Sequence, residues 1–214
     1  MAKKMDVTIP QAMSLRAMAT DKGVGRVRFQ TAMDNGQASL FLDAVKDGRK
    51  ITLLPEFVAP EGGRIHELTI PVVLDEEWQA AITAGGPDTP DNYNVRKVGD
   101  QYRPSGKGTK KSRMILVNFG PNGGSWDRAI AWAAQYPQLK RSAPRQVFAI
   151  SKHKPDLHRE LGFNPMYVVA TTECTFEGTR RACSAWWGGA EREARLYWVS
   201  DFTDADGWFA FFCE

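Results

Sequence analysis

The segment of residues 25–58 reads GRVRFQTAMDNGQASLFLDAVKDGRKITLLPEFV, and it carries the strongest fold signal in the chain. Its first part alternates apolar Val27 and Phe29 with basic Arg26 and Arg28, which is typical of a strand buried on one side. An Asn-Gly and an Asp-Gly dipeptide follow, and each favours a tight hairpin turn. The segment therefore predicts a three-stranded β-meander, with strands over residues 25–33, 38–45 and 51–58.

The remainder of the chain continues this strand-rich pattern. Asp75 and Ser125 are suited to cap helices, and Gly162 is suited to end one. With about ten strands and about four short helices, the predicted class is α+β with an antiparallel-rich sheet. The further expected strands are 65–73, 114–119, 146–151, 166–176, 179–187, 195–203 and 208–213, the last two as a hairpin, and the expected helices are 75–84, 126–136 and 155–161.

The composition of the 214-residue chain, 43% hydrophobic and 25% charged, is that of a globular protein. It fits a single α+β domain over residues 1–214, or two lobes, 1–86 and 114–214, joined by a loop over 87–113. No apolar run approaches the ~20 residues that a membrane span needs, and no apolar segment follows the basic start. With three cysteines, an odd number, these features predict a cytoplasmic protein with reduced thiols and no membrane contact.

Positive charge is concentrated between Tyr93 and Arg113. This stretch has seven basic residues and one acid, Asp100, for a net charge of +6, whereas the whole chain carries +3. Such cations can displace counterions from phosphates, and the interleaved Tyr93 and Tyr102 can stack on unpaired bases. The alternative is a solvated loop that binds nothing. The basic residues are Arg96, Lys97, Arg103, Lys107, Lys110, Lys111 and Arg113.

Arg26 and Arg28 extend this pattern, because they share one face of the first predicted strand. A basic sheet face beside a basic loop is how small β-barrels and open sheets hold single strands, although ordinary meanders carry such residues for solubility. We therefore expect a non-catalytic protein without a cofactor that binds nucleic acid. The expected ligand is single-stranded, and base sequence matters little.

Trp186 and Trp187 support an alternative function. Six of the seven tryptophans lie at or beyond Trp126, and most are expected to fill the core. The adjacent pair could instead anchor a protein partner, because tryptophan is enriched at the energetic centres of interfaces. In this alternative the chain is a protein-interaction module, such as an inhibitor or assembly component of a phage or plasmid system.

Motifs for metal or nucleotide chemistry are weak. Residues 106–112 (GKGTKKS) lack the spacing of a phosphate-binding P-loop and precede a strand, not a helix. His153 and His158 are five residues apart and fall on different helix faces, which does not suit a metal. The acids of residues 201–206 fail the register of a calcium loop and are explained by a turn. We therefore expect no metal.

One weak pattern points to an enzyme. Arg26, Thr171-Thr172 and the Glu191-Arg192-Glu193 triplet follow the order in which arginine-directed ADP-ribosyltransferases carry Arg, Ser/Thr and Glu-x-Glu. The resemblance implies that one glutamate polarises a nicotinamide ribose and another orients the acceptor. The Ser-Thr-Ser element is missing here, and a charged turn explains the triplet equally. An ADP-ribosyltransferase-like enzyme therefore stays a remote alternative.

Overall fold

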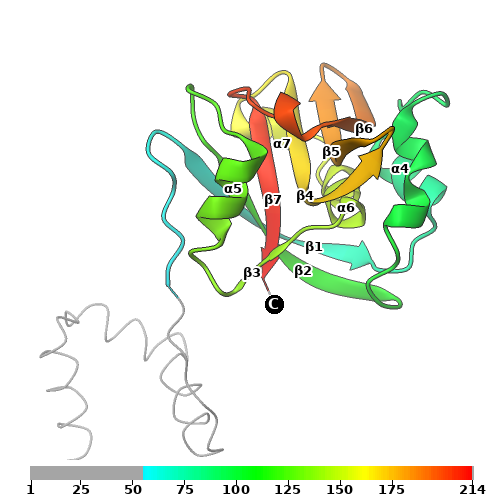
Figure 1. The fold of residues 1–214 in the computed structure, drawn as a ribbon, viewed down its shortest axis with the longest axis horizontal. Coiled ribbons are helices and arrows are strands. Elements are labelled where there is room, and N and C mark those ends of the chain that lie inside the picture. The colour runs from blue at the N-terminus through cyan, green and yellow to red at the C-terminus, as the bar shows by residue number, and fades with distance from the viewer. Residues whose placement is uncertain (1–54, 214) are drawn as a thin grey trace, which may run out of the picture. The chain divides into compact units, whose positions relative to one another are not determined.

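The computed structural model describes residues 55–213, which form a seven-stranded sheet and four α-helices (Figure 1). The predicted α+β class with a largely antiparallel sheet is confirmed, but the described strands number seven rather than about ten. The predicted meander lies outside the described residues, except for residues 55–58, which belong to no strand. The strands are β1 (Arg64–Val73), β2 (Thr109–Asn118), β3 (Leu139–Arg141), β4 (Met166–Phe176), β5 (Thr179–Gly188), β6 (Glu191–Trp198) and β7 (Gly207–Cys213).

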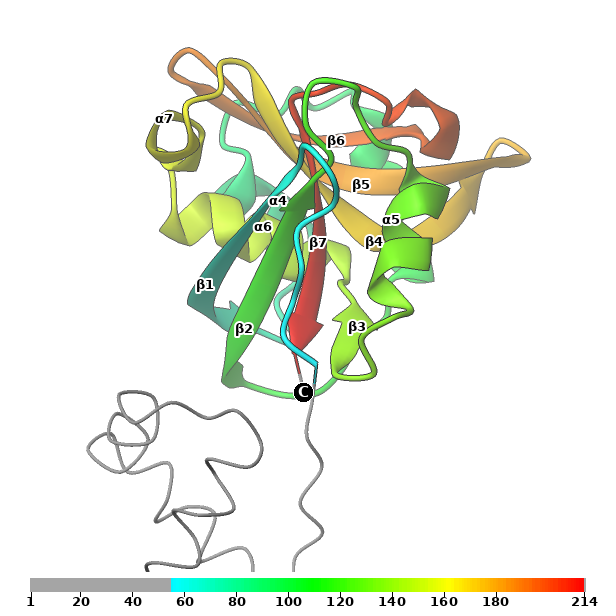
Figure 2. The same ribbon diagram turned by 90° about the vertical axis from the view of Figure 1, so that its left-hand side faces the viewer.

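The helices connect these strands and cover the sheet on both faces. α5 packs on one face, and α6 and α7 pack on the other (Figure 2). α4 lies against α6 and the ends of β4 to β6, next to two 3-10 turns, η1 and η2. The bounds are α4 (Trp78–Gly85), η1 (Asn94–Lys97), η2 (Gly99–Gln101), α5 (Trp126–Ala133), α6 (Pro144–His153), α7 (Leu157–Leu161) and a third 3-10 turn, η3 (Val199–Asp201).

The C-terminal strand β7 lies inside the sheet, whose order is β1-β2-β7-β4-β5-β6. One edge of β7 pairs antiparallel with β2. The other edge pairs first with β4, in parallel over residues 207–210, and then with β3, over residues 211–213. Because both faces of β7 are covered, apolar side chains are favoured at every position, which explains the unbroken run from Trp208 to Phe212.

A buried polar cluster joins β3 to β4 where both meet β7. The hydroxyls of Ser142 and Thr171 each donate to the Ala210 carbonyl at 2.7 Å, and Thr171 Oγ1 accepts from the Ser142 amide at 2.9 Å. Both side chains are fully buried. The cluster satisfies backbone groups that the change of partner along β7 would otherwise leave without hydrogen bonds.

Several local predictions are confirmed. β1, β4 and β5 occupy the predicted ranges, and Glu177 and Gly178 join β4 to β5 with positive φ angles of 50° and 71°. The Ser125 hydroxyl accepts a hydrogen bond from the Arg128 amide at 3.1 Å and so caps α5. Gly162 ends α7 at a φ of 79°. Each of these signals depends on neighbouring residues alone.

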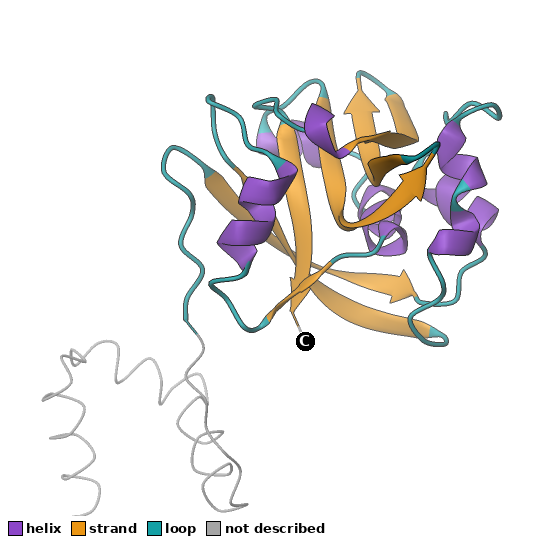
Figure 3. Ribbon diagram, in the orientation of Figure 1, coloured by secondary structure: helices purple, strands orange, loops and turns teal. Residues whose placement is uncertain are grey.

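The predicted strand over residues 146–151 is wrong, because this segment lies in α6 (Figure 3). Pro144 occupies the first turn, where the missing amide hydrogen does no harm, and the Gln146 side chain accepts from the Ala143 amide at 2.7 Å. Residues 144–151 are all buried, between the sheet and α4. Its four consecutive apolar residues, Val147 to Ile150, also suit a short buried strand, and such a run does not by itself distinguish the two.

The predicted C-terminal hairpin is also wrong. β6 ends at Trp198 and β5 is its one partner strand among the described residues, while β7 runs between β2 and β4. The acidic turn before Gly207 is present, but it leads the chain from the sheet edge back into the sheet interior. A turn motif indicates that the chain reverses, and it does not indicate which strand the chain then joins.

Two boundaries near the basic stretch differ from expectation. β2 begins at Thr109, five residues before the predicted strand, so that part of the expected loop is strand. The cap of α4 is Glu77, whose carboxylate accepts from the Ala80 amide at 2.9 Å, and not Asp75. Asp75 instead accepts from the Gly108 amide at 3.0 Å and joins the end of β1 to the start of β2.

Candidate nucleic-acid interface

Four basic residues lie in the first residues of β2 or in the segment that leads into it. Lys110 and Lys111 are adjacent on β2 and pair with Val72 and Pro71, so their side chains leave opposite faces of the ribbon. None of these four side chains forms a hydrogen bond or ion pair with a described residue, and all four residues are exposed. We name this group the basic tip: Arg103, Lys107, Lys110 and Lys111.

The backbone of the basic tip is held in place. The Leu74 amide donates to the Gly108 carbonyl at 2.9 Å, and Gly108 adopts a φ of 71° that favours glycine. This closes the turn into β2 directly after the last ladder pair, Val73 with Thr109. The cations therefore project from the ordered end of the β1–β2 strand pair.

The three acids that follow β1 in the chain are engaged elsewhere. Asp75 accepts from the Gly108 amide, and Glu77 caps α4. Glu76 accepts from Lys152 Nζ of α6 at 3.1 Å. These three carboxylates reduce the positive potential, yet none of them forms an ion pair with a tip residue.

Two other residues that were predicted to contact phosphate form hydrogen bonds within the protein instead. The Arg96 guanidinium donates to the carbonyls of Thr89 and Pro90 and to the side chain of Gln79. Arg113 donates twice to the Glu67 carboxylate, at 2.6 and 3.1 Å. Both cations therefore stabilise local structure. Lys97 is exposed, and its ammonium donates to the Asn94 side chain at 3.1 Å.

The predicted stacking residues are not brought to the basic tip. Tyr102 is only 7% exposed, and its ring stacks on Trp78 with centroids 5.5 Å apart. Burial raises the pKa of its hydroxyl, whose neighbours include the thiols of Cys174 and Cys183. Tyr93 is half-buried and packs against the same cluster. Arg26 and Arg28 lie outside the described residues.

The two tryptophans predicted to anchor a protein partner have different environments. Trp187 is 0% exposed and lies in the core between the sheet and α6, so it is not a surface anchor. Trp186 is half-buried on the opposite face, where the Arg195 guanidinium lies 3.8 Å from its ring centroid. Adjacent strand residues point to opposite faces, which the sequence reasoning did not apply to this pair.

Sequence reasoning missed Trp198, which is 46% exposed. The Arg181 guanidinium stacks 3.5 Å from its ring centroid, and a hollow of about 370 Å³ adjoins it, lined also by Trp126 and Arg180. The signal that could have indicated exposure is its position at the end of edge strand β6, directly before the η3 turn.

The residues of the weak enzymatic pattern are not assembled. Thr171 is fully buried, and its hydroxyl is committed to Ala210. Glu193 lies on β6, separated from β4 by β5, and its carboxylate pairs with Arg195 at 2.6 Å. Arg26 is outside the described part of the chain. Within residues 55–213, no group of three or more His, Cys, Asp or Glu side chains could hold a metal ion, and the three cysteines are free.

Comparison of the chain with protein-family models, with curated proteins and with solved structures gives no match. Among the described residues, none of the helices combines the length and the apolar character needed to cross a lipid bilayer. Functional inference therefore depends on the chemistry of the surfaces described above.

Proposed function

We propose that the protein binds nucleic acid through the basic tip, with little dependence on base sequence. The observation that supports this proposal is the four exposed cations that have no partner among the described residues. An unpaired surface cation is free to neutralise a phosphate, and the release of the counterions that it displaces from the nucleic acid drives binding. Cations already paired with carboxylates, such as Arg113, contribute much less.

The geometry favours a single strand over a duplex. Lys110 and Lys111 project from opposite faces of the ribbon end, so a ligand that contacts both must bend around it. Single strands bend easily, whereas duplex DNA has a persistence length of about 150 base pairs. A duplex would contact the cations of one face only. Because none of the residues described at the tip is aromatic, we expect electrostatic affinity without base readout.

The test is a titration of labelled single-stranded and duplex oligonucleotides by fluorescence anisotropy, using the full chain. With four phosphate contacts, affinity for single strands should fall about 50-fold between about 50 and about 200 mM salt. The triple variant Lys107→Ala, Lys110→Ala, Lys111→Ala retains one of the contacts. Its affinity should therefore fall only about threefold over the same range.

A matched variant separates local contacts from net charge. Lys152→Ala, Lys154→Ala, Arg159→Ala removes the same formal charge from α6 and α7, where each residue pairs with an acid. We expect this variant to keep the salt dependence of the unmodified protein. The proposal fails if the two triple variants behave alike, or if no oligonucleotide binds at low salt.

A second candidate function is protein binding, which the exposure of Trp198 favours. Trp and Arg are the residues most enriched in interface hot spots, and Trp198 with Arg181 presents both beside a hollow. This surface and the basic tip have no residue in common. A Trp198→Ala variant would leave oligonucleotide binding unchanged, which distinguishes the two surfaces.

A further inference from the structure

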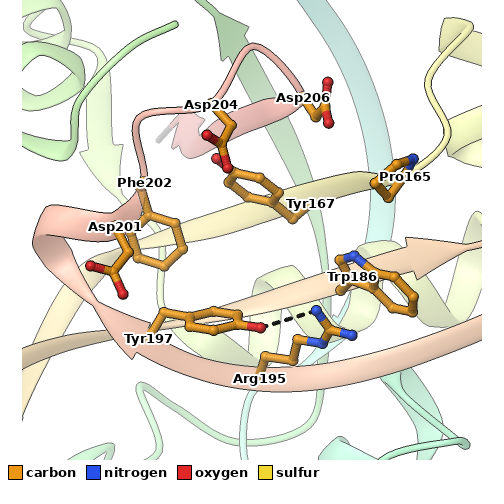
Figure 4. A pocket seen from close by; sticks show the side chains of 9 residues that line it. All are labelled: Pro165, Tyr167, Trp186, Arg195, Tyr197, Asp201, Phe202, Asp204 and Asp206. Carbon is orange, nitrogen blue, oxygen red and sulfur yellow. Dashed lines mark hydrogen bonds between the residues drawn. The ribbon is translucent and has the colours of Figure 1, made fainter.

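A pocket of about 280 Å³ lies on the sheet face opposite α6, over β4, β5 and β6 (Figure 4). Tyr167 and Trp186 are direct partners across β4 and β5, and Arg195 and Tyr197 follow on β6. These four side chains share one face of the sheet and form one side of the pocket.

The segment between β6 and β7 forms the other side of the pocket. It contributes the buried ring of Phe202, whose centroid lies 5.8 Å from that of Tyr167 and 6.2 Å from that of Tyr197. It also contributes three carboxylates, which stand around the aromatic rings in Figure 4. These are Asp201, Asp204 and Asp206.

Two glycines hold the aromatic rings in place. A Cβ atom at Gly188 would lie 2.1 Å from the Trp186 ring, and one at Gly207 would lie 2.7 Å from the Tyr167 hydroxyl oxygen. Each ring is thus packed directly on backbone that only glycine permits. The pocket walls are therefore set before any ligand arrives, which lowers the entropic cost of binding.

The charge of the pocket is negative. Arg195 is the one cation among the described residues that line it, and it donates from Nε to Glu193 at 2.6 Å and from Nη1 to the Tyr197 hydroxyl at 3.0 Å. Glu193 is 8% exposed and neutralises this guanidinium directly. Among the described residues, no ion pair engages the three aspartates, so their charges are free to act on a ligand.

The buried hydroxyl of the pocket is also compatible with a bound cation. The Tyr167 hydroxyl oxygen is buried and has no hydrogen-bond partner among the described residues. Burial and the charges of Asp204 and Asp206 raise its pKa, so the hydroxyl stays neutral. Negative carboxylates beside uncharged aromatic faces repel phosphate and attract cations, which sets this pocket apart from the basic tip.

We propose that this pocket binds an organic cation, a guanidinium or alkylammonium group. The ring faces of Tyr167 and Tyr197 supply cation–π contacts, Trp186 with its stacked Arg195 closes the wall, and the aspartates supply the counter-charge. The wall already accepts such a group, because the Arg195 guanidinium stacks 3.8 Å from the Trp186 centroid. The same chemistry occurs in free amines and in basic side chains of peptides.

Calorimetric titration of the full chain with matched ligand pairs tests this proposal. Agmatine and choline carry the two cationic groups, and 3,3-dimethylbutan-1-ol is the neutral isostere of choline. We expect saturable binding of at least one cation and at least tenfold weaker binding of the isostere, because a desolvated cation–π contact contributes about 2 kcal/mol. A peptide with one central arginine, compared with its alanine form, decides whether the pocket also accepts a side chain.

Variants locate the binding to the pocket. Asp204→Asn with Asp206→Asn removes two charges and keeps the shape, and Tyr197→Leu removes an aromatic face. Each should weaken cation binding about tenfold or more, whereas Asp127→Asn with Asp156→Asn, outside the pocket, should not. Equal binding of the isostere, equal effects of both aspartate pairs, or no binding of any cation would overturn the proposal. Oligonucleotide binding by the basic tip is independent of all of these results.

Discussion

Replacing Trp187 by alanine is expected to lower the free energy of unfolding by about 3–5 kcal/mol. Its side chain is 0% exposed and is among the largest of those fully buried in the core between the sheet and α6. Removing it takes away apolar burial and leaves a cavity that the surrounding β4, β5 and α6 residues can fill only in part. Urea unfolding followed by far-ultraviolet circular dichroism measures the loss.

Trp186→Ala is the matched control for this change. The two residues are adjacent in β5 and identical in chemistry, but Trp186 is half-buried over Gly188 on the opposite face. We expect a loss of about 1–2 kcal/mol, since less apolar area returns to water. Because a one-residue slip of a strand exchanges its faces, equal losses or a reversed order would contradict the register of β5.

Arg145→Ala is expected to cost about 2–4 kcal/mol, because it removes two hydrogen bonds from a charged donor. The Arg145 guanidinium donates to the carbonyls of Glu76 and Tyr102 and lies 5.3 Å from the Trp78 ring centroid. It thereby ties α6 to the segment that carries η1 and η2. The Tyr102 carbonyl would be left buried without this partner. Urea unfolding measures the stability, and hydrogen exchange at residues 94–104 measures the local loosening.

Lys152→Ala is the control for Arg145→Ala on the same helix. Lys152 forms a partly exposed ion pair with Glu76, so its removal should cost at most about 1 kcal/mol. Arg145→Lys keeps the charge but loses the planar guanidinium that donates to two carbonyls at once. We therefore expect it to lower the free energy of unfolding by part of the loss in Arg145→Ala. Unchanged exchange at residues 94–104 in Arg145→Ala would contradict the anchoring of this segment.

The parts of the fold that could be predicted depend on local chemistry. Glu177 and Gly178 permit a tight turn, Ser125 supplies a cap, and Gly162 adopts a left-handed conformation that ends α7. β1 alternates between buried and exposed residues along much of its length, because it is an edge strand of the sheet. In each case the signal and the structure involve residues within a few positions of each other.

The parts that could not be predicted depend on distant partners. The apolar run of α6, Val147 to Ile150, suits a buried strand as well as a helix. The run from Trp208 to Phe212 does not indicate that β7 lies between β2 and β4. Sequence order made β6 the natural neighbour of β7. The parallel pairing of β7 with β4 is specified by packing across the whole sheet, which a turn motif cannot reveal.

The same limit applies to the candidate site. The count of charges between residues 93 and 113 was correct, but it could not show that Arg96 and Arg113 have internal partners. Nor could it show that Tyr102 is buried on Trp78. The aspartates of residues 201–206 were interpreted as turn residues, and only the sheet brings aromatic rings from three strands beside them.

Lysine acetylation footprinting is the most direct test of the basic tip. The full chain is acetylated briefly with and without saturating single-stranded oligonucleotide, and each lysine is quantified by mass spectrometry. We predict that the ligand protects Lys107, Lys110 and Lys111, while Lys152 and Lys154, which pair with acids, are modified equally in both samples. Bound oligonucleotide that leaves the three tip lysines as reactive as in the free protein would contradict the proposal.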